Sequence, residues 1–153
     1  MLSTLRSRAS REEGFTLVEL LVVILIVGIL AAIALPTFLG QQKKGQDASA
    51  KSDARNTVSQ IESCYTDTQD YTNCAAGSTQ MTQANTGLNL VTGTPTSGQV
   101  AIGTLTATGY VITAMSKSGN SFIITKAASG AITRTCQVGS GGGGSCSGAG
   151  ASW

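Results

Sequence analysis

The sequence predicts an α+β fold in which one long N-terminal helix carries a small head built on an antiparallel β-sheet. Three observations support this prediction. A run of 25 largely apolar residues, 15–39, contains a single charge. The polar segment that follows, 41–66, places its apolar residues at helical spacing. Short runs rich in β-branched and aromatic residues then alternate with turn signals between residues 100 and 138.

The apolar run is long enough to cross a membrane. A helix of this length spans about 37 Å, whereas the hydrocarbon core of a bilayer is about 30 Å thick. Arg6, Arg8 and Arg11 precede the run, so the N-terminus is expected in the cytoplasm and the residues after Leu39 outside. The single charge is Glu19, and a carboxylate inside an apolar helix is costly unless it finds a partner.

Two other interpretations of this run remain open. A secretory signal would have a shorter apolar region followed by a small-residue cleavage site, and residues 31–34 fit such a site. An ordinary single-pass anchor accounts for the length and the arginines. It gives no reason for Glu19, unless that side chain reaches the cytoplasmic interface.

The start of the run reads GFTLVELL, residues 14–21, and resembles the processing site of type IV prepilins and pseudopilins. In that family a membrane peptidase cuts after the Gly and methylates the new N-terminal Phe. The resemblance therefore implies cleavage after Gly14 and N-methylation of Phe15. It covers about residues 8–60, is specific at 14–21, and beyond residue 60 concerns architecture alone. Glu12 and Glu13 depart from it, because many leaders place a basic residue there.

The resemblance also implies a role for one residue of the helix. Glu19 of an incoming subunit would pair with the N-terminal amine of a neighbour, which would relieve its charge and set the axial register. Gly28 and Pro36 interrupt an otherwise strong helix, and many pilins carry a helix-loosening proline where Pro36 stands. Either the interruption is a harmless membrane-helix kink, or it lets the segment stretch or melt during packing.

The expected organisation is a leader at 1–14, a transmembrane and filament-core helix at 15–39, an amphipathic helix at 40–66 and a globular β head at 67–153. Ala54, Val58, Ile61 and Tyr65 define the apolar face of the amphipathic helix. Residues 75–98 read as a connecting loop. A meander of three or four strands is expected over 100–105, 110–116, 121–126 and 131–138. Trp153 is placed to pack back onto the sheet.

Four cysteines, all after the apolar run, predict disulfides in an exported head: Cys64, Cys74, Cys136 and Cys146. They allow three pairings. The local pairing, 64 with 74 and 136 with 146, is favoured because each interval of ten residues is polar or glycine-rich and can turn back. The crossed pairings and four free thiols remain open.

No enzyme is expected. The chain has no histidine, and we find no nucleophile–base pair, metal cluster or cofactor motif, so no catalytic, cofactor or metal site is predicted. A net charge of +2 without a basic tract makes nucleic acid a poor candidate partner.

The resemblance implies a structural subunit of a type IV pilus-like filament. The subunit would be a single-pass membrane protein before assembly and part of an extracellular filament afterwards. Its partners would be further copies of the chain, the prepilin peptidase and methyltransferase, a membrane assembly platform and the lipid bilayer. The alternatives are a pseudopilin of a type II secretion system and a minor tip adhesin or DNA-uptake subunit. A second disulfide-closed loop favours a pilin, because pseudopilins often stabilise that region with calcium.

Overall fold

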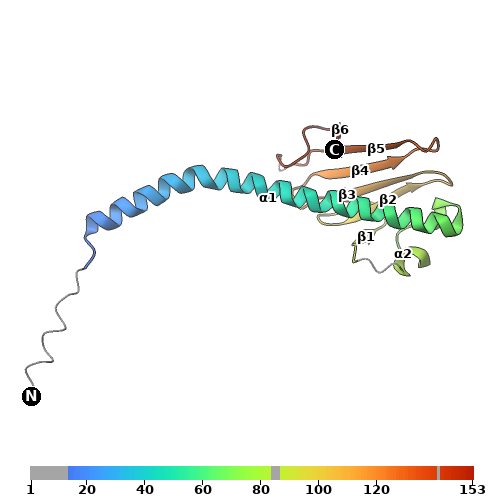
Figure 1. Cartoon of the computed structure of the whole chain (residues 1–153), viewed down its shortest axis with the longest axis horizontal. Coiled ribbons are helices and arrows are strands. Elements are labelled where there is room, and N and C mark those ends of the chain that lie inside the picture. Colours follow the sequence, from blue (N-terminus) through green and yellow to red (C-terminus); the bar gives the residue numbers. More distant parts are fainter. Residues whose placement is uncertain (1–13, 84–86, 141) are drawn as a thin grey trace, which may run out of the picture. The chain divides into compact units, whose positions relative to one another are not determined.

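A computed structural model describes residues 14–83, 87–140 and 142–153 of the chain. The chain divides into two compact units, Met1–Phe38 and Leu39–Trp153. One helix, α1 (Leu17–Thr68), contributes residues to both units (Figure 1). We call the second unit the head.

The first unit contains the apolar part of α1. Nearly all of its described residues are exposed, and only Ala31 is partly covered. Leu and Ala favour the helix strongly, so this segment is helical although nothing in the described chain packs on it. Pro36 lies inside α1, and the helix continues past it.

The head is built on a six-stranded sheet whose strands follow one another in chain order. The strands are β1 (Leu90–Val91), β2 (Val100–Leu105), β3 (Tyr110–Met115), β4 (Ser121–Lys126), β5 (Ile132–Gln137) and β6 (Ala151–Ser152). The pair β1–β2 is parallel, and the other four pairs are antiparallel. A short 3₁₀ helix, η1 (Tyr71–Asn73), and a short helix, α2 (Thr79–Gln83), precede the sheet.

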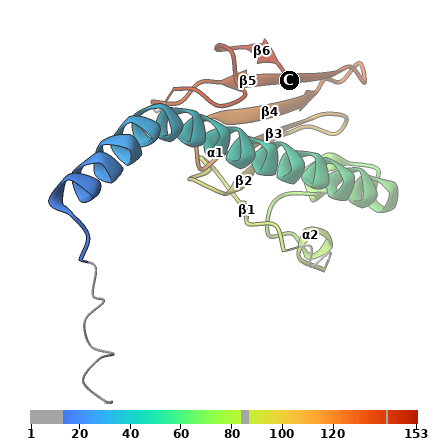
Figure 2. The same ribbon diagram turned by 60° about the vertical axis from the view of Figure 1, so that its left-hand side comes forward.

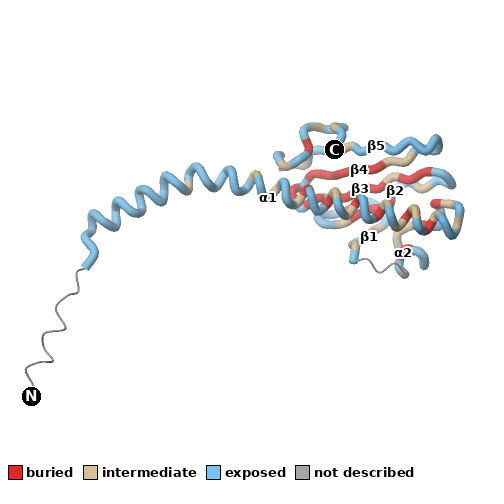
Figure 3. Tube along the Cα trace, in the orientation of Figure 1, coloured by how far each residue is buried: buried red, intermediate tan, exposed pale blue. Residues whose placement is uncertain are grey.

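The core of the head lies between α1 and the sheet, where the two run side by side in both views (Figures 1 and 2). The buried residues of α1 recur at intervals of three and four, which keeps them on one face of the helix. They are Asp47, Ala50, Ala54, Thr57, Ile61 and Cys64. Burial in the sheet is concentrated on β2, β3 and β4, whereas most of β5 is exposed (Figure 3).

The α+β fold class and the four-strand meander are confirmed. Strands β2 and β4 have the predicted bounds, and β3 and β5 are each shorter than predicted by one or two residues. Ala54 and Ile61 are fully buried, and Val58 and Tyr65 pack partly buried against the core. Trp153 does pack on the sheet, since its Nε1 donates to the Thr135 carbonyl oxygen at 2.8 Å.

Two parts of the prediction are wrong. The sheet has six strands rather than three or four, and residues 75–98 contain α2 and β1 as well as loop. Strands β1 and β6 have two residues each, which is too short for any alternation of apolar and polar residues to show. Both are fixed by backbone pairing to a longer neighbour.

Candidate functional site

The junction between Gly14 and Phe15 is an open segment directly before α1. Residues 14–16 have non-helical backbone, and the Phe15 side chain is 89% exposed. A Cβ atom added at Gly14 would meet no atom within 4 Å. The remaining residues of the predicted leader, 1–13, lie outside the described part of the chain.

Glu19 lies in the first turn of α1 and has a partner in its own chain. Its Oε2 accepts hydrogen bonds from the backbone N of Thr16 at 2.9 Å and from Thr16 Oγ1 at 2.8 Å. In return, the backbone N of Glu19 donates to Thr16 Oγ1 at 3.2 Å. This capping box satisfies two backbone N–H groups at the start of the helix. We did not predict the cap, although the Thr-x-x-Glu spacing of residues 16–19 is its sequence signal.

The side chains of residues 17–39 form an uncovered apolar surface on α1. Their large hydrophobic members are between 44% and 79% exposed. The most apolar 18 residues have a mean hydropathy of 3.1, and none of them is buried. In the part of the chain that the structure describes, α1 is the one helix long and apolar enough to cross a membrane.

Gly28 and Pro36 both lie within this apolar surface. Gly28 contributes to a groove of about 520 Å³ whose walls are leucine, isoleucine and alanine side chains, and a Cβ atom there would meet nothing within 4 Å. Pro36 has no N–H to donate to the Ala32 carbonyl. The next residue, Thr37, donates from Oγ1 to the Ile33 carbonyl oxygen at 3.4 Å. The predicted role of these residues in helix flexibility remains a prediction.

A buried carboxylate, Asp47, connects α1 to two loops of the head. It is fully buried, and its oxygens accept from Ser118 Oγ, from Asn120 Nδ2 at 2.9 Å and from the backbone N of Ser145 at 2.7 Å. Asn120 Nδ2 also donates to the Gly143 carbonyl oxygen at 2.9 Å. The network therefore joins the helix, the β3–β4 turn and the loop that follows β5. We did not predict it, because Asp47 stands in a polar stretch that offers no apolar pattern.

Hydrogen bonding keeps Asp47 ionised. Burial by itself raises the pKa of this carboxyl group. The hydrogen bonds from Ser118, Ser145, Ser116 and Asn120 together lower it more, so its pKa lies below the ordinary value of 3.8.

A second polar cluster, which we also did not predict, joins the end of α1 to the sheet. Glu62 accepts from Tyr71 OH at 2.8 Å, from Tyr110 OH at 2.9 Å and from Lys126 Nζ at 2.9 Å. Both tyrosines are only 1% exposed. Burial and the bond to Glu62 raise the pKa of Tyr110, while the bonds from Lys126 and the tyrosines outweigh burial and lower the pKa of Glu62. The cluster consists of satisfied hydrogen bonds and is a structural contact.

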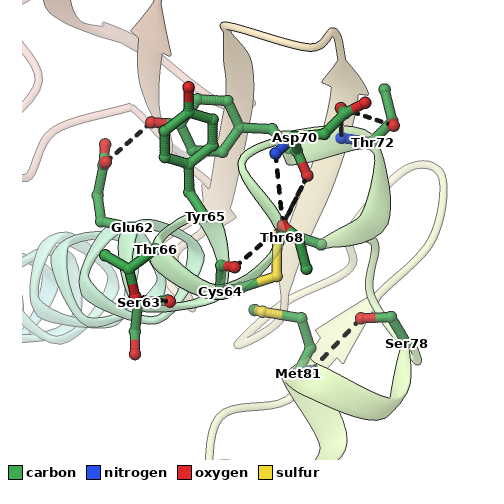
Figure 4. Close-up of a disulfide and its surroundings, with 12 residues drawn as sticks. Glu62, Ser63, Cys64, Tyr65, Thr66, Thr68, Asp70, Thr72, Ser78 and Met81 are labelled. Carbon is green, nitrogen blue, oxygen red and sulfur yellow. Dashed lines mark hydrogen bonds between the residues drawn. A yellow bond between two sulfur atoms is a disulfide. The ribbon is translucent and has the colours of Figure 1, made fainter.

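The structure pairs Cys64 with Cys74 and Cys136 with Cys146, which is the local pairing that the sequence favours. The first bond ties the last turns of α1 to the turn that contains η1 (Figure 4). The second closes the loop after β5, which supplies the Ser145 backbone N to Asp47. The Cα atoms are 6.0 Å and 5.9 Å apart, within the ordinary range for disulfides.

The predicted site residues are not brought together in one place. Gly14, Phe15 and Glu19 lie at the start of α1, whereas the cysteines lie in the head. Within residues 14–83, 87–140 and 142–153, no group of three or more His, Cys, Asp or Glu side chains is arranged to hold a metal ion.

Comparison with known proteins identifies the N-terminal segment. A family model described as "Prokaryotic N-terminal methylation motif" matches residues 9–35. This match includes the Gly14/Phe15 junction, Glu19 and Gly28. No solved structure matches the chain significantly.

Curated relatives fall into two groups. The chain is 36% identical over 100 residues to "Type IV major fimbrial protein FimA" of Dichelobacter nodosus, which covers 65% of this chain and 58% of that protein. It is 37% identical over 65 residues to "Type IV major pilin protein PilA" of Myxococcus xanthus, covering 42% and 30%. It is 38% identical over 61 residues to "Type II secretion system core protein G" of Dickeya chrysanthemi, covering 40% of each. The chain thus spans less than two thirds of the length of each of these relatives.

Proposed function

Because these matches place the chain in the type IV pilin and pseudopilin family, we propose that it is a structural subunit of a type IV pilus-like extracellular filament. That family consists of structural subunits, not enzymes, which agrees with the prediction from the sequence. The subunit is made as a membrane-anchored precursor and enters the filament through the first part of α1.

The uncovered apolar surface of α1 is the observation that carries this proposal. A surface of this size is unstable in water, because each exposed apolar Å² costs about 25 cal/mol relative to burial. Nothing in the described chain covers it. A bilayer covers it before assembly, and the equivalent helices of other copies cover it in the filament.

Processing follows from the same segment. We propose that the prepilin peptidase cuts after Gly14 and that Phe15 becomes the N-methylated first residue. The open backbone at residues 14–16 supports access for a protease, since α1 begins only at Leu17. The new α-amino group would then lie close in sequence to Glu19, which is the proposed assembly residue.

Intact-mass analysis of filaments sheared from the surface of the native cells tests the proposal. We expect a chain that starts at Phe15 and carries one added methyl group. Loss of residues 1–14 removes three arginines and two glutamates, so the formal net charge falls from +2 to +1. A mature N-terminus near Ala34 would establish ordinary secretion and overturn the proposal.

A pseudopilus subunit is the second candidate, because relatives named type II secretion system core protein G match the same chain. We favour a pilus subunit, because pseudopilins often stabilise the corresponding region with calcium. In this chain the loop after β5 is held by a disulfide and by a hydrogen bond to Asp47 instead. Deletion of the gene separates the candidates. Loss of surface filaments with normal secretion of exported enzymes supports the pilus, and the opposite outcome supports the pseudopilus.

A further inference from the structure

The head contains a cleft of about 250 Å³ between α1 and the sheet. We call it the arginine cleft, because two of its lining residues are arginines, one from α1 and one from β5. Its lining residues are Arg55, Val58, Ser59, Ile124, Ile132 and Arg134.

The cleft exists because the start of β5 is left uncovered. Ile132 and Arg134 are exposed, whereas Ile124, which pairs with Arg134 in the neighbouring strand, is only 1% exposed. Strand β6 pairs with Thr135 and Cys136 alone and leaves the first residues of β5 open on that edge. In the described head, Ile132 is one of just two large hydrophobic residues past Leu39 that are exposed.

Both guanidinium groups lack an anionic partner in the described chain. The one salt bridge between described residues joins Lys126 to Glu62. Arg55 is held by an aromatic contact instead, since its guanidinium carbon lies 5.2 Å from the centre of the Trp153 ring. Trp153 is itself fixed by its hydrogen bond to Thr135. The contact with Trp153 therefore holds Arg55 in place, while its guanidinium N–H groups can still donate to an anion. The apolar side chains of the cleft lie beside it.

Two arginines around a small, partly apolar cleft suit a carboxylate on a short apolar stem. Most carboxylates of the described head have another role. Asp47 and Glu62 are bound internally, and Asp70 accepts from the backbone N and Oγ1 of Thr72. Asp53 lines a different depression, together with Lys117. Asp67, in the last turns of α1, is exposed and takes part in none of the described hydrogen bonds or salt bridges.

We propose that the arginine cleft binds Asp67 of a second copy of this chain. Within one molecule Asp67 cannot reach Arg55, because the two lie twelve residues apart on one helix, which is about 18 Å, and it forms no salt bridge with Arg134. The arginine cleft and Asp67 lie on different parts of the surface of the same head, so each copy would offer its cleft to one neighbour and its Asp67 to another. Contacts of that type are heterologous and, when they do not close into a ring, build an open helical filament. The inference rests on the proposed filament function and adds a contact between heads to the packing of the apolar helices.

Charge reversal in the full-length chain tests this contact. We expect R134E and D67K each to lower the yield of sheared filaments about tenfold. The double variant R134E/D67K should recover most of the wild-type yield, because the pair is restored with reversed sign. Two controls change the same charges elsewhere. K44E alters an exposed lysine outside the cleft and should assemble normally, and R134E/D53K should not recover. The membrane pool of each variant, with both disulfides formed, shows that the heads are folded.

Cross-linking identifies the partner directly. In filaments of R134K, a carbodiimide should join Asp67 to position 134, and mixed isotope-labelled filaments show that the bond is between copies. Normal assembly of R134E, or a cross-link from position 134 to a different carboxylate only, would overturn the inference while the filament function stands. Failure of the wild-type chain to form filaments with its complete assembly apparatus would instead contradict the proposed function.

Discussion

The two parts of α1 differ in burial, and the difference is the opposite of what their composition alone would suggest. Residues 17–38 are almost entirely apolar and almost entirely exposed, whereas residues 39–68 are largely polar and contain every buried residue of the helix. The later part is buried because the chain itself supplies a sheet to pack on it. The earlier part has no such partner in the described chain. Hydropathy therefore indicates how much a segment gains from burial, and the fold decides whether its own chain provides that burial.

The acidic residues of the two parts show the same contrast. Glu19 is bound to Thr16, three residues away, in the first turn of an exposed helix. Asp47 is fully buried and accepts from residues 71 to 98 positions away in the sequence. The first carboxylate is organised locally and remains accessible to another molecule, whereas the second is committed to the fold of its own head.

The largest effect that we predict concerns Glu19 and filament yield. In E19A both the charge and the helix cap are lost, and we expect a stable membrane protein that scarcely enters filaments. E19Q keeps a side chain that can complete a capping box but removes the charge. If the charge is what assembly requires, E19Q should fail as completely as E19A when sheared filaments are quantified.

Thr16 provides the matched control. T16A breaks the cap while keeping the carboxylate, and loss of a cap costs about 1 kcal/mol of helix stability. We expect filaments from T16A cells at close to the wild-type amount. Normal fibres from E19Q together with few from T16A would mean that the cap, and not the charge, is the assembly feature.

The second prediction compares one substitution in each part of α1. Ile61 is fully buried, so I61A should lower the free energy of unfolding of the head by about 2–5 kcal/mol. Ile29 is 56% exposed, and I29A should change it by less than about 0.5 kcal/mol. Urea unfolding of the full chain in detergent micelles, followed by the fluorescence of Trp153, measures both values. Similar losses from the two variants would contradict the division into an internally packed and an externally packed part.

The third prediction concerns the two disulfides, which only the head contains. Replacing Cys64 and Cys74 together by alanine should cost about 2–3 kcal/mol, and so should replacing Cys136 and Cys146. Loss of the second bond also frees the segment that supplies the Ser145 amide to Asp47, so we expect it to be the more damaging of the two. Peptide mapping without reductant checks the pairing, and a peptide joining Cys64 to Cys136 or Cys146 would rule it out.

How far the fold follows from the sequence depends on the range of each signal. The apolar run, the helical face with Ala54 and Ile61, and the long strands are local patterns, and all were predicted. Strands β1 and β6 were missed because pairing with a neighbour, not local sequence, creates them.

The same difference between local and long-range signals decides which functional and structural residues could be chosen from the sequence. Gly14, Phe15 and Glu19 lie within eight consecutive residues that resemble a known motif, so they could be chosen from the sequence. The partners of Asp47 and Glu62 come from loops and strands far along the chain, and no spacing rule relates them before folding. Arg55 and Arg134 read individually as solvated surface residues, and only the fold brings them to one cleft.

The fourth prediction concerns the loss of the Asp47 charge, tested with D47N. The asparagine keeps the shape and one acceptor oxygen, but its NH₂ group faces the donors of Ser118, Asn120 and Ser145. We expect a loss of about 1–2 kcal/mol in the free energy of unfolding at neutral pH. The measurement is the same urea unfolding in micelles, repeated from neutral pH into the acid range.

The pH dependence of that loss identifies the carboxylate as its source. The pKa of Asp47 in the folded head is below 3.8, so as the pH falls past 3.8 the unfolded chain takes up its proton first. The stabilisation is therefore complete above this pH and disappears as the pH falls through the folded pKa. Glu62 also loses stabilisation on acidification, but it does so equally in both proteins. The curves of unfolding free energy against pH for the wild type and D47N should accordingly converge below about pH 3.8. A constant separation between the two curves would show that packing, not charge, explains the role of Asp47.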